Sequence, residues 1–232
     1  MCTNFIPTPK NLYRASLKWS EPTFDYKVET YVTYRAPIRL LARDTREPEL
    51  REASFGLIPF WAKDGKIARK TYNARAETVA ERPSYRDSWR KGRLALVPLV
   101  GFFEPNYESG RPIRWRIGRV DEEPFTVAAI WDFWRGADGA ESTTSFSMLT
   151  INADGHPLMA RFHAPGDEKR SLVIIPPDLR DRWLTSSASE AIEFLKPMAA
   201  DEFTAWPDPA PPRKRVGSPR TTKGESEGFM GY

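Results

Sequence analysis

The sequence predicts an α+β fold in which antiparallel β-structure predominates and a few short helices lie at the periphery. Short runs rich in β-branched and aromatic residues recur along the chain, several of them bounded by Gly, Pro or Asp. Few helical patterns separate these runs, so repeated βαβ units are not indicated. The expected strands are Thr30–Tyr34, Ile38–Ala42, Leu94–Val100, Ile113–Ile117, Phe125–Trp131, Ser145–Ile151 and Ser171–Ile175.

Helical patterns are fewer and shorter than the strand patterns. The segment at Pro176-Pro177-Asp178 has a good start signal, because proline suits the first turn of a helix. The expected helices are Arg75–Glu81, Tyr85–Lys91, Pro177–Leu184 and Ser189–Leu195.

The chain divides by composition into a body and a tail. Residues 1–206 are expected to form one domain, whereas residues 207–232 are rich in Pro, Gly, Ser and charge and predict a disordered polar tail. The 232 residues carry a net charge of +4, a balance that permits nucleic-acid binding without requiring it.

Counting excludes several classes of protein. No apolar run is long enough to cross a bilayer and no signal-peptide pattern opens the chain, so we expect a cytoplasmic protein without a membrane partner. One Cys and two His cannot supply the four ligands of a structural zinc site. We therefore expect neither a metal nor another cofactor.

Cys2 directly follows the initiator methionine. Methionine is generally trimmed before a small residue, which would leave a free α-amine (pKa about 7.7–8.0) beside a thiol (pKa about 8.5). The amine of such a 1,2-aminothiol forms an imine with an aldehyde, and the thiol then closes a thiazolidine ring. Taken by its position alone, however, Cys2 is better interpreted as an incidental cysteine on a frayed terminus, and the reactive interpretation needs partners elsewhere in the sequence.

Four later segments, in this order behind Cys2, resemble the SOS-response-associated peptidase (SRAP) family. The resemblance runs from Cys2 to about Pro177, and the "NARAET" run is its most specific part. The segments are Phe55–Trp61 (FGLIPFW), Tyr72–Thr78 (YNARAET), Val97–Pro105 (VPLVGFFEP), and Leu149-Thr150 with Ala160–His163.

The resemblance implies a barrel- or sandwich-like fold and an activity on DNA. A protein of this type is expected to sense and shield abasic sites in single-stranded DNA through a thiazolidine link to Cys2 after Met1 is removed. It further implies a nucleoid-associated protein that works as a monomer.

Roles follow for individual residues by the same resemblance. Asn73 is implied to orient Cys2, Glu104 to move protons during imine formation, and His163 to open the sugar ring and to reverse the crosslink. For DNA, Arg75 is implied to contact the backbone. Trp61 and Pro37 are implied to shape the groove, and Thr150 to lie on a strand that lines the site.

The residue types suit these roles, although simpler interpretations stay open. Glu104 follows the apolar stretch Leu96–Phe103, where a carboxylate is partly desolvated and suited to proton transfer, yet it is also interpretable as a strand-end residue that faces water. Asn73 is also a candidate helix cap. His163 precedes a loop signal, whereas His156 fits a turn.

The basic and aromatic residues also allow two interpretations. Trp61 and Arg75 belong to a stretch in which cations alternate with aromatic rings, a pattern that suits single strands. Alternatively, the rings belong to the core and the charges to a solvated face.

The chain departs from the family pattern at three places. Thr3-Asn4 stands where the family usually has Gly-Arg, and Pro105 where Trp is common. Residues 164–170 (APGDEKR) form an altered, more polar loop where the family often reads D-R-M-P.

Three other functions therefore remain open. They are an N-terminal-nucleophile thiol peptidase or amidohydrolase, a non-covalent single-strand-binding module with an inert Cys2, and an amine-driven lyase that nicks the strand by β-elimination.

Overall fold

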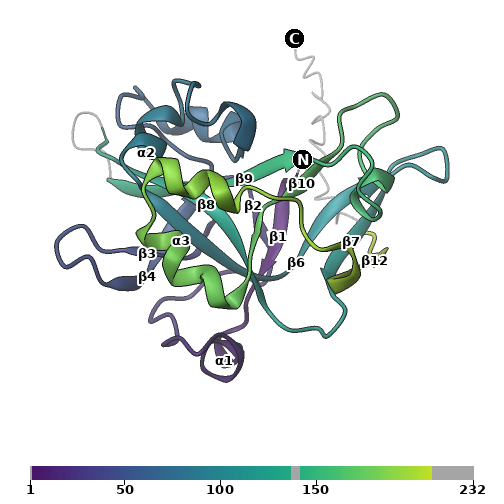
Figure 1. Cartoon of the computed structure of the whole chain (residues 1–232), viewed down its shortest axis with the longest axis horizontal. Coiled ribbons are helices and arrows are strands. Elements are labelled where there is room, and N and C mark those ends of the chain that lie inside the picture. The colour runs from purple at the N-terminus through teal and green to yellow at the C-terminus, as the bar shows by residue number, and fades with distance from the viewer. Residues whose placement is uncertain (1, 137–141, 211–232) are drawn as a thin grey trace, which may run out of the picture.

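A computed structural model describes residues 2–136 and 142–210, so all but the first four residues of the predicted tail lie outside the described residues. Strand is the main structure within these ranges (Figure 1). The strands are β1 (Asn4–Pro7), β2 (Thr30–Tyr31), β3 (Arg35–Leu41), β4 (Pro48–Phe55), β5 (Asn73–Arg75), β6 (Leu94–Asn106), β7 (Ile113–Arg119), β8 (Phe125–Trp134), β9 (Thr143–Asn152), β10 (Arg170–Leu172), β11 (Ile174–Ile175) and β12 (Phe203–Pro207).

The helices are short and peripheral, as predicted. The α-helices are α1 (Lys10–Leu12), α2 (Arg86–Arg90), α3 (Arg180–Thr185) and α4 (Ala188–Ala191). A π-turn at Tyr13–Leu17 extends α1. Short 3-10 helices occupy Gly65–Lys70, Ala76–Thr78, Met159–Arg161, Pro177–Leu179, Ile192–Phe194 and Ala200–Glu202.

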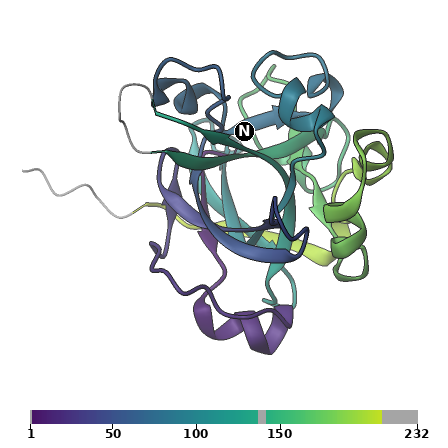
Figure 2. The same cartoon turned by 90° about the vertical axis from the view of Figure 1, so that its left-hand side faces the viewer.

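Five strands close into a barrel in the order β8-β9-β4-β3-β6, because β6 pairs with β3 on one side and with β8 on the other. Of these pairings only β4 with β9 is parallel. Figure 2 shows the strands curling around the enclosed core, with the purple helical segment after β1 below them. The predicted α+β, mainly antiparallel and barrel-like fold is confirmed.

Strand β6 is the longest and connects the barrel to the site. Its first half, Leu94–Leu99, pairs with β8, and its second half, Phe102–Asn106, pairs with β7. Gly101 lies between the halves, and a Cβ there would stand 2.7 Å from Arg116 Nε and 3.3 Å from Ile117 O. The glycine therefore allows close approach of β7 where β6 changes partners. The prediction that this strand ends at Val100 is wrong for that reason.

Two cores stabilise the barrel. The interior holds stacked and edge-on phenylalanines, among them Phe5, Phe55 and Phe146, with ring centroids 5.3–6.5 Å apart. A second cluster lies between the barrel and α3, where the buried Trp183 donates its Nε1–H to Ala95 O at 2.9 Å. Because Phe5 belongs to the interior cluster, β1 enters the barrel core two residues after Cys2.

The structure corrects several predicted elements. The helix predicted at Arg75–Glu81 is wrong, because β5 pairs in parallel with β9 and leaves only the 3-10 turn Ala76–Thr78. The strand predicted at Thr30–Tyr34 stops at Tyr31, since Thr33 has a left-handed φ of +75°. The strand predicted at Ser171–Ile175 is divided between β10 and β11.

Strand β4 was not predicted at all. Its residues Glu49, Arg51 and Glu52 are charged, and its inward positions include the small Ala53. The apolar alternation is therefore too weak to stand out in the sequence.

At the end of the described residues, β12 runs to Pro207, and Asp208 N donates to Arg114 O at 3.0 Å.

Candidate active site

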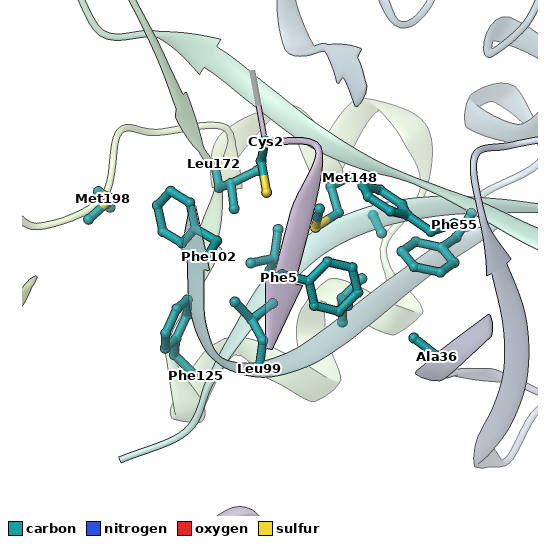
Figure 3. Close-up of a cluster of buried hydrophobic side chains, with 14 of the residues drawn as sticks. Cys2, Phe5, Ala36, Phe55, Leu99, Phe102, Phe125, Met148, Leu172 and Met198 are labelled. Carbon is teal, nitrogen blue, oxygen red and sulfur yellow. The ribbon is translucent and has the colours of Figure 1, made fainter. Parts of the chain in front are cut away.

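Cys2 lies at the top of the barrel core, not on a loose end. Its side chain is 1% exposed, and its Sγ–H donates to Asn4 O at 3.3 Å. Figure 3 shows the sulfur pointing into a cluster in which Phe102, Met148 and Leu172 are labelled. Burial, and next the charge of Glu104, raise the pKa of the Cys2 thiol far above its usual range. The thiol is therefore protonated at neutral pH.

Asn73 holds the backbone of Cys2 in place. Its Nδ2–H donates to Cys2 O at 2.7 Å, and its own backbone carbonyl accepts from Tyr85 Oη at 3.0 Å. The position follows from β5, whose pairing with β9 places Asn73 opposite Met148. Asn73 Oδ1 is buried and has no hydrogen-bond partner among the described residues. This oxygen is available to an incoming donor.

Glu104 and His163 form a buried acid–base pair beside Cys2. Glu104 is 3% exposed and His163 7%, and Glu104 Oε2 lies 3.3 Å from His163 Nε2. His163 has a left-handed φ of +67° and its backbone N–H donates to Pro105 O at 3.0 Å, which ties the loop to the end of β6. A strained backbone in a buried polar cluster is typical of a functional site.

Tyr72 adds a phenol hydroxyl to this cluster. Burial raises its pKa, and the charge of Glu104 and the thiolate form of Cys2 raise it further. The two charge effects require Tyr72 to lie near Glu104 and Cys2. Tyr72 was not expected in the reactive site, and its position directly before Asn73 is the sequence signal that could have assigned it there.

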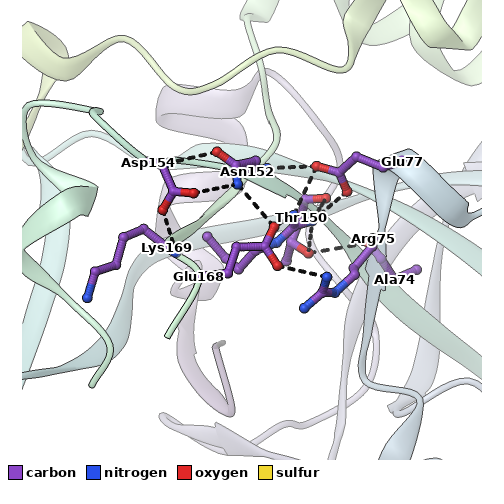
Figure 4. A network of polar contacts seen from close by, with 9 residues as sticks. Ala74, Arg75, Glu77, Thr150, Asn152, Asp154, Glu168 and Lys169 are labelled. Carbon is purple, nitrogen blue, oxygen red and sulfur yellow. Dashed lines mark hydrogen bonds and ion pairs between the residues drawn. The ribbon is translucent and has the colours of Figure 1, made fainter. Parts of the chain in front are cut away.

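Arg75 and Thr150 meet through the pairing of β5 with β9, in which they stand opposite each other. Arg75 is half-exposed, and its Nη1 lies 2.7 Å from Glu168 Oε2 (Figure 4). Thr150 is 1% exposed, and its hydroxyl lies 3.5 Å from Ala74 O. Arg75 thus reaches the surface, whereas Thr150 supports it from below.

A buried arginine that sequence reasoning missed anchors the same network. Arg170 is 3% exposed and contacts Glu77 at 2.8 Å, Glu168 at 2.7 Å and Thr150 O at 2.7 Å. Burial alone would raise the pKa of Glu77, but the hydrogen bond and charge of Arg170, together with backbone hydrogen bonds, outweigh burial and lower it. In the sequence, Arg170 ends the polar run 164–170, and this position gave no sign that its side chain is buried.

The family follows from direct comparison. The model of the family described as SOS response associated peptidase (SRAP) matches residues 1–210. The chain belongs to the SRAP family.

Several SRAP relatives carry descriptive names. The chain is 28% identical over 189 residues to "Abasic site processing protein YoqW" of Bacillus subtilis, with 80% of each chain covered. It is 23% identical over 182 residues to "Abasic site processing protein HMCES" of Gallus gallus, which covers 66% of this chain and 51% of the relative.

Solved structures share the fold. A protein from Bordetella bronchiseptica superimposes with a TM-score of 0.82 and 30% identity over 90% of this chain and 100% of that one. A protein from Bacteroides thetaiotaomicron gives a TM-score of 0.72 at 24% identity, over 89% of this chain and 91% of that one.

The departure of this SRAP chain at Thr3-Asn4 has a local structural reason. Asn4 is 7% exposed and its Nδ2–H donates to Glu29 Oε1. Glu29 in turn pairs with Arg114 at 3.0 Å. Asn4 therefore belongs to a buried polar contact on β1 and does not project a positive charge toward a ligand.

The remaining groove residues are placed differently from one another. Trp61 and its neighbour Phe60 are 48% and 55% exposed on the loop after β4, so they are free of the core. Lys91 Nζ stands 5.2 Å from the Phe60 ring centroid. Pro37, in contrast, is buried in β3. Trp61 therefore lies on the surface, whereas Pro37 is part of the packed interior.

Other features of the described residues do not add to the site. No group of three or more His, Cys, Asp or Glu within the described ranges is arranged to hold a metal ion. No helix in the described part of the chain has the length and apolar character to cross a bilayer. A cavity of about 530 Å³ lies elsewhere, lined by residues that include Phe125, Ile174 and Arg180.

Proposed function

We propose that this protein processes abasic sites in single-stranded DNA by joining its Cys2 covalently to the lesion, once Met1 has been removed. The observation that carries the proposal is the clamp on Cys2, whose backbone is held by Asn73 beside the Glu104–His163 pair. Two curated relatives that cover much of the chain are named abasic site processing proteins, which supports the substrate.

The first step joins the freed α-amine of Cys2 to the ring-opened aldehyde at C1 of the sugar. The amine attacks the carbonyl, a proton moves to the carbonyl oxygen, and water leaves as the imine forms. Glu104 and His163 are 3.3 Å apart and buried, so one of them donates a proton to the departing oxygen while the other accepts one from the amine.

The second step closes the thiazolidine. The thiol is protonated in the resting protein because burial and Glu104 raise its pKa, so the amine reacts before the sulfur. The S–H then adds across the C=N bond, which forms the C–S bond and transfers the proton to nitrogen without any oxidant. Asn73 Oδ1, which has no partner among the described residues, can accept a hydrogen bond from the new N–H.

DNA would reach this site over residues that face the surface. Arg75 contacts a backbone phosphate when it exchanges its Glu168 partner, and Trp61 offers an exposed ring to a base. Thr150 and Pro37 act indirectly, because both are buried behind these contacts.

Intact mass spectrometry with an abasic single strand tests the proposal. The trimmed protein is expected to gain the mass of the oligonucleotide minus one water, in a bond that survives denaturation. Cys2→Ala should abolish the stable adduct. Cys2→Ser keeps the amine, so its imine should be trapped only by borohydride, and β-elimination through that imine should nick the strand.

Three outcomes would overturn the proposal in different ways. A trimmed protein that gains no mass excludes covalent capture. Binding that is equal for intact and abasic strands and unchanged in Cys2→Ala leaves a non-covalent single-strand-binding module. Cys2-dependent turnover of an amide substrate, without any DNA adduct, leaves the peptidase that the family description names.

A further inference from the structure

Two tyrosines lie side by side on the surface next to β1, the strand that begins two residues after Cys2. Tyr31 is 41% exposed and Tyr34 38%, and their ring centroids are 5.7 Å apart at an interplanar angle of 69°. Each ring therefore keeps open surface, although aromatic rings gain more by burial than by hydration. Exposed aromatic pairs of this kind mark interaction sites when their surroundings indicate a partner.

Cations stand around the two rings. Lys27 Nζ lies 4.2 Å from the Tyr34 ring centroid, and no ion pair within the described residues holds Lys27. On the other side, the Arg114 guanidinium stacks 3.4 Å from the Phe103 ring centroid and pairs with Glu29. We refer to Lys27, Tyr31, Tyr34 and Arg114 as the tyrosine–cation patch.

The patch is held in place from beneath. Burial raises the pKa of Tyr31, and so do its hydrogen bond with Glu29 and the charge of Glu29, whereas Arg114 opposes the shift. The phenol end of Tyr31 is thus anchored at the Glu29–Arg114 pair. On the Tyr34 side, Phe55 N donates to Tyr34 O at 2.8 Å, which fixes the turn against β4. A preorganised ring binds at a lower entropic cost.

The patch also lies at a defined separation from Cys2. Tyr31 pairs with Asn4, two residues beyond Cys2. For an extended chain from Asn4 back to Cys2, with a rise of about 3.3 Å per residue and a strand spacing of about 4.8 Å, the Cα atoms of Tyr31 and Cys2 would stand about 8 Å apart. At about 3.4 Å per stacked base, this span corresponds to roughly two to three nucleotides.

We propose that Tyr31 and Tyr34 form a stacking subsite for an unpaired nucleobase, about two to three nucleotides away from the sugar held at Cys2. Positive charge beside partly exposed aromatic rings is the combination that suits single-stranded nucleic acid, since cations follow phosphates and rings stack on bases. This inference rests on the proposed function and specifies where the undamaged part of the strand lies.

The test uses a single strand with a tetrahydrofuran abasic analogue, which has no aldehyde and so reports only non-covalent binding. A 2-aminopurine is moved along the strand one position at a time. Its fluorescence should be quenched most at the second or third nucleotide on one side of the lesion. The quench should disappear in a Tyr31→Ala/Tyr34→Ala double variant and persist in Tyr31→Phe/Tyr34→Phe, which keeps both rings.

Affinity gives a second readout. Loss of one stacked base should weaken Kd for the strand by about 5- to 150-fold, because base stacking on an aromatic ring contributes about 1–3 kcal/mol. Lys27→Gln should flatten the dependence of binding on salt, since one phosphate contact is lost. Both tyrosines are exposed, so the alanine variant should melt within a few degrees of the wild type.

The outcomes separate the two proposals. If Cys2 forms the covalent adduct but the alanine variant keeps wild-type Kd and quenching, the stacking subsite is wrong and the proposed function stands. If no adduct forms with any abasic strand, the proposed function fails, and with it this inference. Uniform quenching at all positions would likewise overturn the inference, because it would show that no base has a fixed place.

Discussion

The clamp between Asn73 and Cys2 predicts how far reactivity depends on one hydrogen bond. Asn73→Ala removes the 2.7 Å bond to Cys2 O and leaves a buried carbonyl without its donor. An unsatisfied buried group of this kind costs about 1–3 kcal/mol. If all of this energy holds Cys2 in its reactive position, the crosslinking rate falls by about 5- to 150-fold.

The same variant should lower Tm by roughly 2–12 °C, because 1 kcal/mol shifts Tm by about 2–4 °C in a chain of this size. Rates are measured by quenching the reaction with abasic oligonucleotide and resolving the adduct on a denaturing gel. Thr126→Val is the control, since it removes buried hydrogen bonds away from Cys2: the 2.8 Å bond to Ile175 O and the 3.2 Å bond from Arg180 Nε.

The two variants together decide whether the hydrogen bond from Asn73 positions Cys2 for reaction or only stabilises the fold. Thr126→Val should lose stability and keep its crosslinking rate, whereas Asn73→Ala should lose both. The clamp would have no positioning role if Asn73→Ala reacted at the wild-type rate while its Tm fell as far as that of Thr126→Val.

Three further predictions concern the charges, the thiol and the surface ring. Glu168→Gln removes the ion pair of Arg75, so binding of single-stranded DNA should tighten by up to about fivefold at low salt. The gain is limited because a half-exposed ion pair contributes at most about 1 kcal/mol. An unchanged Kd in a salt titration would contradict this. Since its pKa is raised, the Cys2 thiol should react slowly with iodoacetamide at pH 8 and faster as pH rises. Unfolding in urea should restore the ordinary reactivity of a thiol. Equal rates in folded and unfolded protein would exclude a shielded thiol. Trp61→Ala should weaken binding by about 5- to 150-fold in fluorescence anisotropy, whereas Trp61→Phe should keep most of the affinity. Equal losses in both Trp61 variants would argue against stacking.

The fold class was predictable because strands of alternating or continuous apolar character occupy most of the body. The places where the prediction failed share a cause. The run at Arg75–Glu81 has helix-forming residues, yet β9 takes the backbone hydrogen bonds of Asn73–Arg75 in a pairing across more than seventy residues. Likewise β6 continues beyond Gly101, because new partners replace the old ones there. Local propensity carries no information about such partners.

The candidate site divides in the same way. Cys2, Asn73, Glu104 and His163 were named from motifs, but their proximity depends on the pairing of β1 with β6 and of β5 with β9. The covering of Arg75 by Glu168 and the burial of Arg170 were invisible, because they depend on how the 164–170 loop folds back. Motifs thus indicated the chemistry, and tertiary pairing determined which groups touch.

The docking of β1 against β6 has a consequence for the order of events at the ribosome. The start of the chain finds its place only after residues up to Asn106 have emerged, since Phe5 pairs with Phe102 and Cys2 lies beyond it. At about 5–20 residues per second, roughly 5–20 s pass before that partner exists. The N-terminal segment is therefore open to an aminopeptidase during synthesis, whereas the Cys2 side chain is buried once β1 has docked. Nascent chains stalled before and after Asn106 should differ in how readily Met1 is trimmed, and equal trimming would show that burial does not limit maturation.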